Sequence, residues 1–260
     1  MNELRTMHLF AGHGGGLLAD LILGHKPVVA VEWDGYACQV LRERAADGWF
    51  PGLRVHEGDV SLFDPSEYAG SVDCIHAGFP CQDISVAGKQ AGVSEGTRSG
   101  LYREVLRIAG VVRPKQLFLE NVSAILGNGL GTVLGDMATM GYECRWLCIR
   151  ASDVGCEHER DRFFLLGFNT NCRHAAREQS DGRQGAIPKK WTAKENFKKR
   201  DGRQFQLGAI NDAQRFTSYS GALRTLHGIP NRVHRLKGLG NAQVPLQAAT
   251  AYRLLGGACK

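Results

Sequence analysis

The chain has 260 residues, of which 43% are hydrophobic and 22% charged, and its formal net charge is +6. This length and composition exclude a short peptide, a disordered chain and a collagen-like repeat, and they predict one large soluble domain with at most a small additional lobe. The longest apolar stretches fall short of the ~20 residues that a bilayer span needs, and the first residues lack the pattern of a secretory signal. We therefore expect a cytoplasmic protein without a membrane segment.

Charge is distributed unevenly along the chain. Residues 1–167 have a net charge of −6, residues 168–237 have +10 and residues 238–260 have +2. Because affinity for phosphate comes mainly from Lys and Arg, this division suggests an acidic body for catalysis or cofactor binding, joined to an element that binds a polyanion. A solvated basic loop is the alternative.

Apolar strand-like runs alternate with helix-capable segments through the first two thirds of the chain. The expected strands are Thr6–Phe10, Val28–Val31, Val72–His76, Gln116–Leu119, Arg145–Ile149 and Phe163–Gly167. The expected helices are Leu17–Leu23, Leu101–Val111, Val133–Met140 and Leu246–Leu255. This alternation predicts an α/β fold with a doubly wound, mostly parallel sheet.

The alternation ends after Phe168, and this change divides the chain into three parts. We expect a catalytic and cofactor-binding domain at residues 1–168 and a short, basic recognition region at residues 169–237. The helical pattern that resumes near the end indicates a C-terminal segment, residues 238–260, that packs back on the first domain.

A glycine-rich turn, residues 10–15, joins the first expected strand to the first helix. Glycines there let backbone amides and the helix N-terminus approach a ligand. Glu32 ends the second strand, where a carboxylate can accept both hydroxyls of a ribose, and Trp33 offers an aromatic face to a purine. Asp59 is placed to accept from an exocyclic amino group. A core role for Trp33 and an N-cap role for Asp59 are the alternatives, and a nicotinamide cofactor would use the same architecture.

Cys81 has the setting of a reactive thiol. It follows the expected Val72–His76 strand, and open α/β sheets place their sites at the carboxyl ends of strands. The basic, glycine-containing loop after it, residues 85–100, is suited to close over a substrate. We therefore expect Cys81 to be the nucleophile if the protein is an enzyme.

The other cysteines have simpler explanations. Without a signal peptide, all eight are expected to remain reduced, with Cys38, Cys74 and Cys259 as small buried hydrophobic residues. Zinc binding is the alternative for the four that remain, together with one histidine, but they lack the tight CxxC spacing of structural zinc sites, and we expect no metal. These five residues are Cys144, Cys148, Cys156, His158 and Cys172.

Charged residues lie next to two further strands. Glu120 comes directly after the expected Gln116–Leu119 strand, which presents a carboxylate at the same edge of the sheet as Cys81. Arg160 and Arg162 alternate just before the last expected strand, so both side chains can point to one face. Surface ion pairing is the alternative for these arginines.

At these residues the chain resembles the DNA cytosine-5 methyltransferases. The motifs occur in the family's order over nearly the whole chain, and they are Phe10–Gly15, Glu32–Trp33, Asp59, Pro80–Gln82, Arg98–Leu101, Glu120–Val122, Arg160 with Arg162, and Gly240–Asn241. The resemblance implies a Rossmann-like methyltransferase sheet with a small, basic DNA-recognition lobe, S-adenosylmethionine as the methyl donor, and double-stranded DNA as the partner. An enzyme of this kind flips its target cytosine out of the helix.

The resemblance also implies roles for the reactive residues. Cys81 would add as a thiolate to carbon-6 of cytosine, which makes carbon-5 able to attack the methyl group. Glu120 would hold and protonate ring nitrogen-3, Arg162 would hold the carbonyl oxygen, and Arg160 would support Glu120 or a phosphate. Loss of the carbon-5 proton and expulsion of Cys81 would then release 5-methylcytosine.

Further contacts are implied by the same resemblance. The expected cofactor-binding residues are Phe10, Gly12, Gly14, Gly15, Glu32, Trp33, Asp59, Val60, Pro80, Leu101 and Asn241. The expected DNA-binding residues are Gln82, Ser85, Lys89, Arg98, Lys189, Lys190, Lys198, Lys199, Arg200 and Arg203. We expect a monomer.

The chain departs from the family's pattern at three positions and in one length. His8 stands where an acidic residue is usual, His158 where Gln is usual, and Gln243 where Val is frequent. The region between the arginines and Gly240–Asn241 is short for the family, which implies a short target site and resembles phage or prophage enzymes. An RNA cytosine-5 methyltransferase and a catalytically silent DNA-binding homologue are the alternatives, whereas an oxidoreductase would leave the thiol unexplained.

Overall fold

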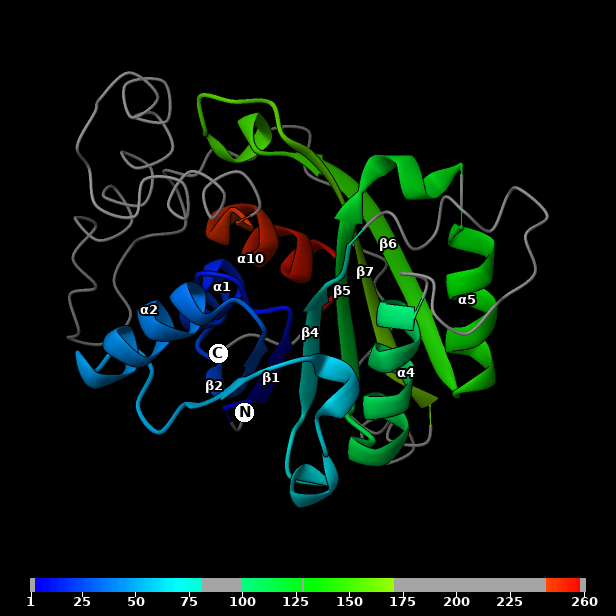
Figure 1. The fold of residues 1–260 in the computed structure, drawn as a ribbon. Helices are drawn as coiled ribbons and strands as arrows, with labels where there is room; N and C mark the ends of the chain where they lie inside the picture. Colours follow the sequence, from blue (N-terminus) through cyan, green and yellow to red (C-terminus); the bar gives the residue numbers. More distant parts are fainter. Residues whose placement is uncertain (1–2, 81–99, 128, 171–241, 258–260) are drawn as a thin grey trace.

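The computed structural model describes residues 3–80, 100–127, 129–170 and 242–257. The strands in this part of the chain are β1 (Arg5–Leu9), β2 (Lys26–Glu32), β3 (Arg54–Glu57), β4 (Cys74–Gly78), β5 (Gln116–Val122), β6 (Tyr142–Arg150) and β7 (Asp161–Asn169). They form one sheet in the order β3-β2-β1-β4-β5-β7-β6 (Figure 1). β1 to β5 are parallel, and β7 runs antiparallel to both of its neighbours.

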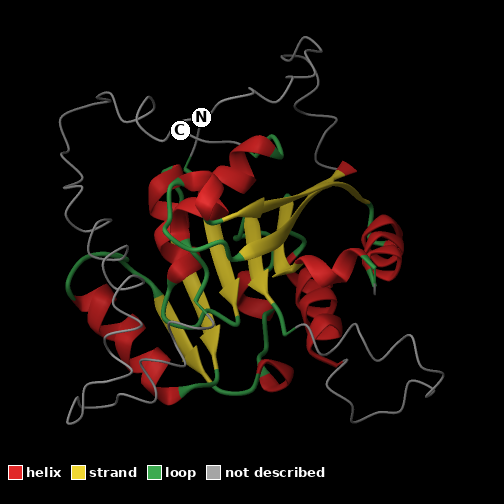
Figure 2. Cartoon of the chain, turned by 90° about the horizontal axis from the view of Figure 1, so that it is seen from above, coloured by secondary structure: helices red, strands yellow, loops and turns green. Residues whose placement is uncertain are grey.

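Helices cover both faces of this sheet (Figure 2). The α-helices of the described residues are α1 (Gly15–Leu23), α2 (Gly35–Ala46), α4 (Gly100–Val112), α5 (Leu130–Thr139) and α10 (Pro245–Leu254). Short 3-10 helices are η1 (Val60–Leu62), η2 (Ser66–Tyr68), η4 (Ser123–Leu126) and η5 (Ser152–Val154). α4 and α5 pack in one core cluster, and α1 and α10 in another. None of these helices combines the length and apolarity that crossing a membrane requires.

The central strands are buried on both faces, which explains their continuous apolar sequences. β1 and β2 each begin with one exposed residue, Arg5 and Lys26, and every residue after it is buried. In a parallel sheet that helices cover on both sides, strands consist of uninterrupted apolar runs rather than alternating ones. The expected α/β fold with a doubly wound, mostly parallel sheet is confirmed.

The sequence patterns do not predict α2, they place only the end of β3, just before Asp59, and they make β5 too short. α2 is capped by Asp34, whose carboxylate accepts from the amides of Tyr36 and Ala37. β3 has only four residues and forms one edge of the sheet, with no buried residue to mark it. β5 continues to Val122, so Glu120 lies within the strand rather than after it.

The C-terminal helix α10 is anchored in the core by Tyr252. Its buried ring packs edge-on against Phe118 of β5 and against His25, and its hydroxyl forms a hydrogen bond with the side chain of Gln116. Aromatic rings in such arrangements contribute stability beyond the area that they bury. Tyr252 therefore connects α10 to the middle of the sheet.

Replacing Tyr252 should test this anchor. Tyr252→Ala leaves a cavity in the core and is expected to lower the free energy of unfolding by about 3–5 kcal/mol. Tyr252→Phe keeps the ring and removes only the hydrogen bond, with an expected loss of about 1 kcal/mol. Urea denaturation followed by circular dichroism measures both, and equal unfolding midpoints for Tyr252→Ala and the unmodified protein would contradict this packing.

The connections of the sheet change direction between β1 and β4. From β1 the chain continues to β2 and β3 on one side, whereas β4 leads to β5 on the other. In open α/β sheets, ligands bind outside the carboxyl ends of the strands at such a switch point. The glycine-rich turn follows β1, and Phe79 and Pro80 follow β4. Both candidate segments therefore leave the sheet where a ligand site is expected.

Candidate active site

The glycine-rich turn is held by the carboxylate of Glu32 at the end of β2. Its Oε2 accepts from the amide of Gly12 (2.7 Å), and its Oε1 accepts from the amides of Trp33 (3.0 Å) and Asp34 (2.9 Å). Phe10 and Gly12 have φ angles of 57° and 53°, a left-handed conformation that glycine adopts easily and phenylalanine rarely. The side chain expected to bind a ribose therefore also shapes the turn.

Trp33 and η1 lie beside this turn. Trp33 is 74% exposed, so the alternative of a core tryptophan is wrong. The amide of Gly58 donates to the last carbonyl of β2 (2.9 Å), which places Asp59 and the buried Val60 next to the end of that strand. Asp59 caps η1 by accepting from the amide of Ser61 (2.9 Å), and this backbone hydrogen bond holds the pKa of the Asp59 carboxyl below its ordinary value.

Arg107, on α4, is a residue that the sequence patterns do not single out. Its guanidinium donates to the carbonyl oxygens of Val60 (3.1 Å) and Phe63 (3.0 Å) and pairs with Glu104. Both carbonyls belong to η1 and its C-cap. Arg107 therefore fixes the turn that carries Asp59, through contacts too distant in the sequence to leave a local pattern.

Two other expected cofactor residues belong to the packing around the turn. Gly14 is the N-cap of α1 with a φ of 91°, and a Cβ atom there would lie 3.0 Å from the side chain of Leu41. Leu101, near the start of α4, is half-buried against the main core.

The end of β4 lies directly beside β5. Gly78 pairs with Glu120 in the parallel register. The side-chain amide of Asn121 donates to the carbonyl of Phe79 (3.2 Å), which fixes the chain as it leaves the sheet. The exposed Pro80 comes next. The segment that leads to the expected nucleophile therefore starts next to the expected acid.

Glu120 and Arg162 form an ion pair between neighbouring strands. Nε of Arg162 lies 3.0 Å from Oε1 of Glu120, and both side chains are largely buried, so the alternative of a surface pair is wrong for Arg162. Burial raises the pKa of Glu120, while the positive charges of Arg162 and Arg160 oppose the rise. Burial also lowers the pKa of the Arg160 guanidinium. The structure therefore gathers the expected carboxylate and both arginines.

The two arginines act on Glu120 in different ways. The resemblance implies that Arg160 supports Glu120 or a phosphate; the charge of Arg160 does act on Glu120, but the direct contact with the carboxylate comes from Arg162. The pairing of β5 with β7 explains this result, because it sets Arg162 opposite Val122, two residues beyond Glu120. The backbone carbonyl of Arg160 instead accepts from the side-chain amide of Gln247 on α10 (2.8 Å).

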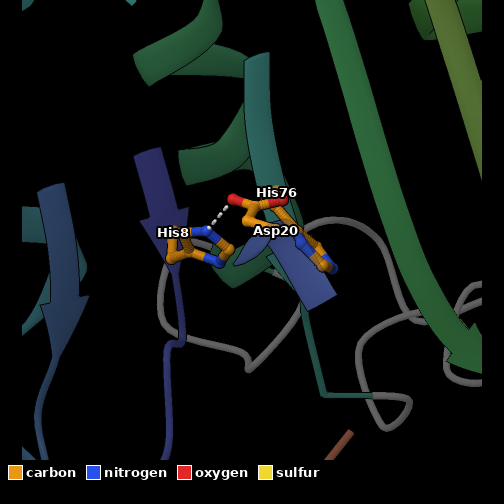
Figure 3. Close-up of side chains that lie close together, drawn as sticks. All are labelled: His8, Asp20 and His76. Carbon is orange, nitrogen blue, oxygen red and sulfur yellow. Dashed lines mark hydrogen bonds and ion pairs between the residues drawn. The ribbon is translucent and has the colours of Figure 1, made fainter. Parts of the chain in front are cut away.

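A buried polar cluster that the sequence does not predict lies where β1, α1 and β4 meet. It contains His8, Asp20 and His76 (Figure 3). Nε2 of His8 donates to Oδ2 of Asp20 (2.7 Å), and the hydroxyl of Thr6 donates to the same oxygen. Burial raises the pKa of Asp20, but His8 and His25 outweigh it and hold that pKa below its ordinary value. Burial lowers the pKa of His76 to about 3, so this imidazole is neutral.

The geometry of this cluster is that of a hydrogen-bonded network. Its three potential ligand atoms lie within 4.8 Å of one another. Both oxygens of Asp20 already face hydrogen-bond partners. No group of potential metal ligands in the described residues includes the cysteines or the histidine of the zinc alternative.

Several sequence expectations concern residues outside the described part of the chain. Among the cysteines expected to be buried, Cys38 and Cys74 are confirmed, and Cys259 lies outside. The other expected site residues that lie outside are Cys81, Gln82, Ser85, Lys89, Arg98, Lys189, Lys190, Lys198, Lys199, Arg200, Arg203 and Asn241. Their assignments stay predictions.

Comparisons with known proteins agree with this arrangement. A family model described as C-5 cytosine-specific DNA methylase matches residues 4–232. Type II methyltransferase M.CviJI of Paramecium bursaria Chlorella virus IL3A is 37% identical over 167 residues, which are 63% of this chain and 43% of the relative. Type II methyltransferase M.HhaI of Haemophilus parahaemolyticus is 33% identical over 175 residues, which are 66% of this chain and 51% of the relative. The chain thus spans about half the length of these relatives.

Solved structures show the same fold. A prophage-encoded protein of E. coli, described as a DNA modification methyltransferase, matches 66% of this chain and 48% of its own with 26% identity and a TM-score of 0.53. The S. pombe Dnmt2 methyltransferase covers 97% of this chain and 98% of its own with 12% identity and a TM-score of 0.63. At that identity the second likeness concerns the fold alone.

Proposed function

Because the chain belongs to the family of C-5 cytosine-specific DNA methylases, we propose that it transfers a methyl group from S-adenosylmethionine to carbon-5 of cytosine in DNA. The observation that carries this proposal is the buried Glu120–Arg162 pair, which joins β5 to β7 on the β4 side of the switch point. Glu120 of the pair lies next to Gly78, which is three residues before Cys81. Gly78 ends β4, and β4 is adjacent to β1, the strand that leads into the glycine-rich turn. The segment that leads toward Cys81, the expected acid and the cofactor turn therefore leave neighbouring strands, which supports the proposal.

The residues around the turn fit S-adenosylmethionine. The exposed face of Trp33 is free to stack on adenine, with Val60 beside the end of β2 and Asp59 within reach of the exocyclic amino group. A carboxylate has about four acceptor positions, and backbone amides occupy three of those of Glu32, which leaves about one for the ribose hydroxyls. When bound, the cofactor supplies an electrophilic methyl group.

Arg107→Ala tests whether η1 forms part of the cofactor site. Loss of the two hydrogen bonds to η1 releases the turn that carries Asp59, so we expect about tenfold weaker binding of S-adenosylmethionine by calorimetry. Arg44→Ala, which removes an exposed pair with Asp47 on α2, is the control and should bind normally. Equal affinities for the two variants would place the cofactor elsewhere.

In the proposed reaction, Cys81 adds as a thiolate to carbon-6 of a cytosine that has been flipped out of the duplex. A carbon–sulfur bond forms, and the ring electrons move to carbon-5. Carbon-5 then forms a bond to the methyl group as the sulfur–methyl bond of the donor breaks, so the leaving group is S-adenosylhomocysteine. Glu120 donates a proton to ring nitrogen-3, which removes the negative charge that addition creates. The raised pKa of Glu120 supports this role, because it increases the protonated fraction at neutral pH.

Arg162 and Arg160 stabilise the same intermediate. Arg162 orients Glu120 through its Nε, and we propose that the rest of its guanidinium reaches the carbonyl oxygen of the cytosine. Arg160 adds positive charge beside Glu120. The reaction ends when a base removes the carbon-5 proton and the electrons left behind expel the Cys81 thiolate, which restores the aromatic ring. Ring nitrogen-3 returns its proton to Glu120, and neutral 5-methylcytosine is released.

We assign DNA binding to the basic part of the chain. Residues 169–237 form the proposed recognition region, with phosphate contacts from Lys189, Lys190, Lys198, Lys199, Arg200 and Arg203, while Gln82, Ser85, Lys89 and Arg98 contact the flipped base or its strand. The +10 charge of residues 168–237 supports the proposed phosphate contacts. The other four residues are assigned to the flipped base or its strand because they follow Cys81 closely in the sequence.

Transfer of a radioactive methyl group from S-adenosylmethionine tests the proposal directly. The purified protein is incubated with duplex DNA of mixed sequence or with tRNA, and each product is digested to nucleosides. We expect label in 5-methyldeoxycytidine from DNA. Label in 5-methylcytidine from tRNA alone would favour the RNA alternative, and binding of DNA and cofactor without label in either would favour the silent homologue.

A further inference from the structure

Three glycines from two segments leave room for Gln243, just before α10. A Cβ atom on Gly15 would lie 2.3 Å from the backbone oxygen of Gln243. One on Gly16 would lie 2.9 Å from its Oε1, and one on Gly78 would lie 3.0 Å from its Nε2. Contacts to backbone oxygen at such distances are not tolerated. The backbone of Gln243 therefore occupies a space that only a glycine at position 15 allows, and its side chain lies close against Gly16 and Gly78.

The side chain of Gln243 joins Glu120 to the buried polar cluster. Its Nε2 donates to Oε2 of Glu120 (3.4 Å), the oxygen that Arg162 does not hold. Three atoms lie close to Gly16: Oε1 of Gln243, Cε1 of His76 and Nδ1 of His8. An amide can donate on one side and accept on the other, which Val, frequent at this position in the family, cannot do.

The groups that face this network fix its charge. Glu120 is approached by Arg162 and Arg160 and by the amide of Gln243, all of which favour its ionised form. On the other side of Gln243, burial keeps His76 neutral, and among the described residues its Nε2 has no hydrogen-bond partner. Next to it, His8 is held by the ionised Asp20. Gln243 thus lies between these histidines and Glu120.

We propose that Gln243 is a positioning residue for Glu120, with its amide held in one orientation by His76 and His8. Arg162 then fixes one oxygen of the carboxyl group and Gln243 the other, so the plane of the acid is set before the cytosine arrives. The departures from the family's pattern at His8 and Gln243 become parts of one network. That Gln243 contributes to catalysis rests on the proposed methyl transfer. That Gln243 contacts and orients Glu120 can be tested without any turnover.

The first test measures the ionisation of Glu120 in the full chain, without turnover. The pH titration of its carboxyl band is followed by infrared difference spectroscopy, with the band assigned by its absence in Glu120→Gln. Gln243→Met keeps length and volume but loses the donor, so the midpoint should rise by about one pH unit. Gln243→Glu adds a like charge and should raise it further. An unchanged midpoint in Gln243→Met would overturn the inference.

The second test uses the kinetics. The fall of kcat at high pH is expected to report the ionisation of Glu120, so Gln243→Met should move this fall to higher pH. Because the acid is no longer held in position, kcat at neutral pH should be about tenfold lower, with KM for S-adenosylmethionine nearly unchanged. Gln39→Met is the matched control, because it removes an exposed amide–carboxylate hydrogen bond with Glu43 on α2 and should leave the titration of Glu120 unchanged. Absence of methyl transfer by the unmodified protein would refute the proposed function, while the infrared result still decides the role of Gln243.

Discussion

Cys81→Ser is expected to reduce methyl transfer at least about 10⁴-fold while leaving DNA and cofactor binding nearly intact. A serine hydroxyl is almost never ionised at neutral pH, whereas a thiol provides a usable fraction of thiolate. Without addition to carbon-6, carbon-5 of cytosine is too weak a nucleophile to attack the methyl group. The expected loss therefore falls on kcat rather than on KM.

Methyl transfer assays at saturating DNA and cofactor measure this effect, and Cys148→Ser is the control. Cys148 is an exposed thiol on the edge strand β6, so its replacement should leave the rate unchanged. A DNA substrate with fluorine in place of the carbon-5 hydrogen adds a second readout, because the proton loss that releases the enzyme is then blocked. We expect a covalent complex with the unmodified protein and none with Cys81→Ser. Normal turnover by Cys81→Ser would refute the assignment of the nucleophile.

Glu120→Gln is expected to lower kcat about 10²- to 10⁴-fold. Gln keeps the shape of the side chain but has no acidic proton to give to ring nitrogen-3. The ion pair between Glu120 and Arg162 is also lost in this variant. In the unmodified protein, burial raises the pKa of Glu120, so the active protonated form persists to higher pH than for an exposed glutamate. Activity should fall as pH rises through that pKa.

A pH profile of kcat for both proteins measures this effect. Glu67→Gln, which removes a half-exposed carboxylate paired with Arg54, is the control and should behave as the unmodified protein does. Glu120→Gln should lack the alkaline limb. A variant with full activity and an unchanged limb would show that another group protonates the cytosine.

The sheet could be predicted from the sequence because burial on both faces leaves a clear pattern. Val28 to Val31 form an uninterrupted apolar run, and the observed β2 extends it by only a few residues. The four residues of β3 lie at an edge, and no such run marks them. For α2, the Asp34 cap was the available signal, since Asp accepting from the following amides starts many helices.

The site was predictable where function depends on residues next to strand ends, and less so where it depends on distant contacts. Glu120 was expected at the carboxyl edge of the sheet and Arg162 in the same site, and the two are in contact. The contacts of Arg107 with η1 and of Gln243 with Glu120 join residues far apart in the chain. The packing of α4 on η1 creates the contacts of Arg107. The space left by Gly15, Gly16 and Gly78 creates the contact of Gln243. No local pattern could have indicated them.

Base-resolution sequencing of 5-methylcytosine tests the central claim most directly. DNA is taken from a host that lacks cytosine methylation and expresses either the unmodified protein or Cys81→Ser. We predict methylation confined to one short sequence motif with the unmodified protein and none with the variant. Unmethylated DNA from cells that contain the folded, cofactor-binding protein would contradict the proposed function.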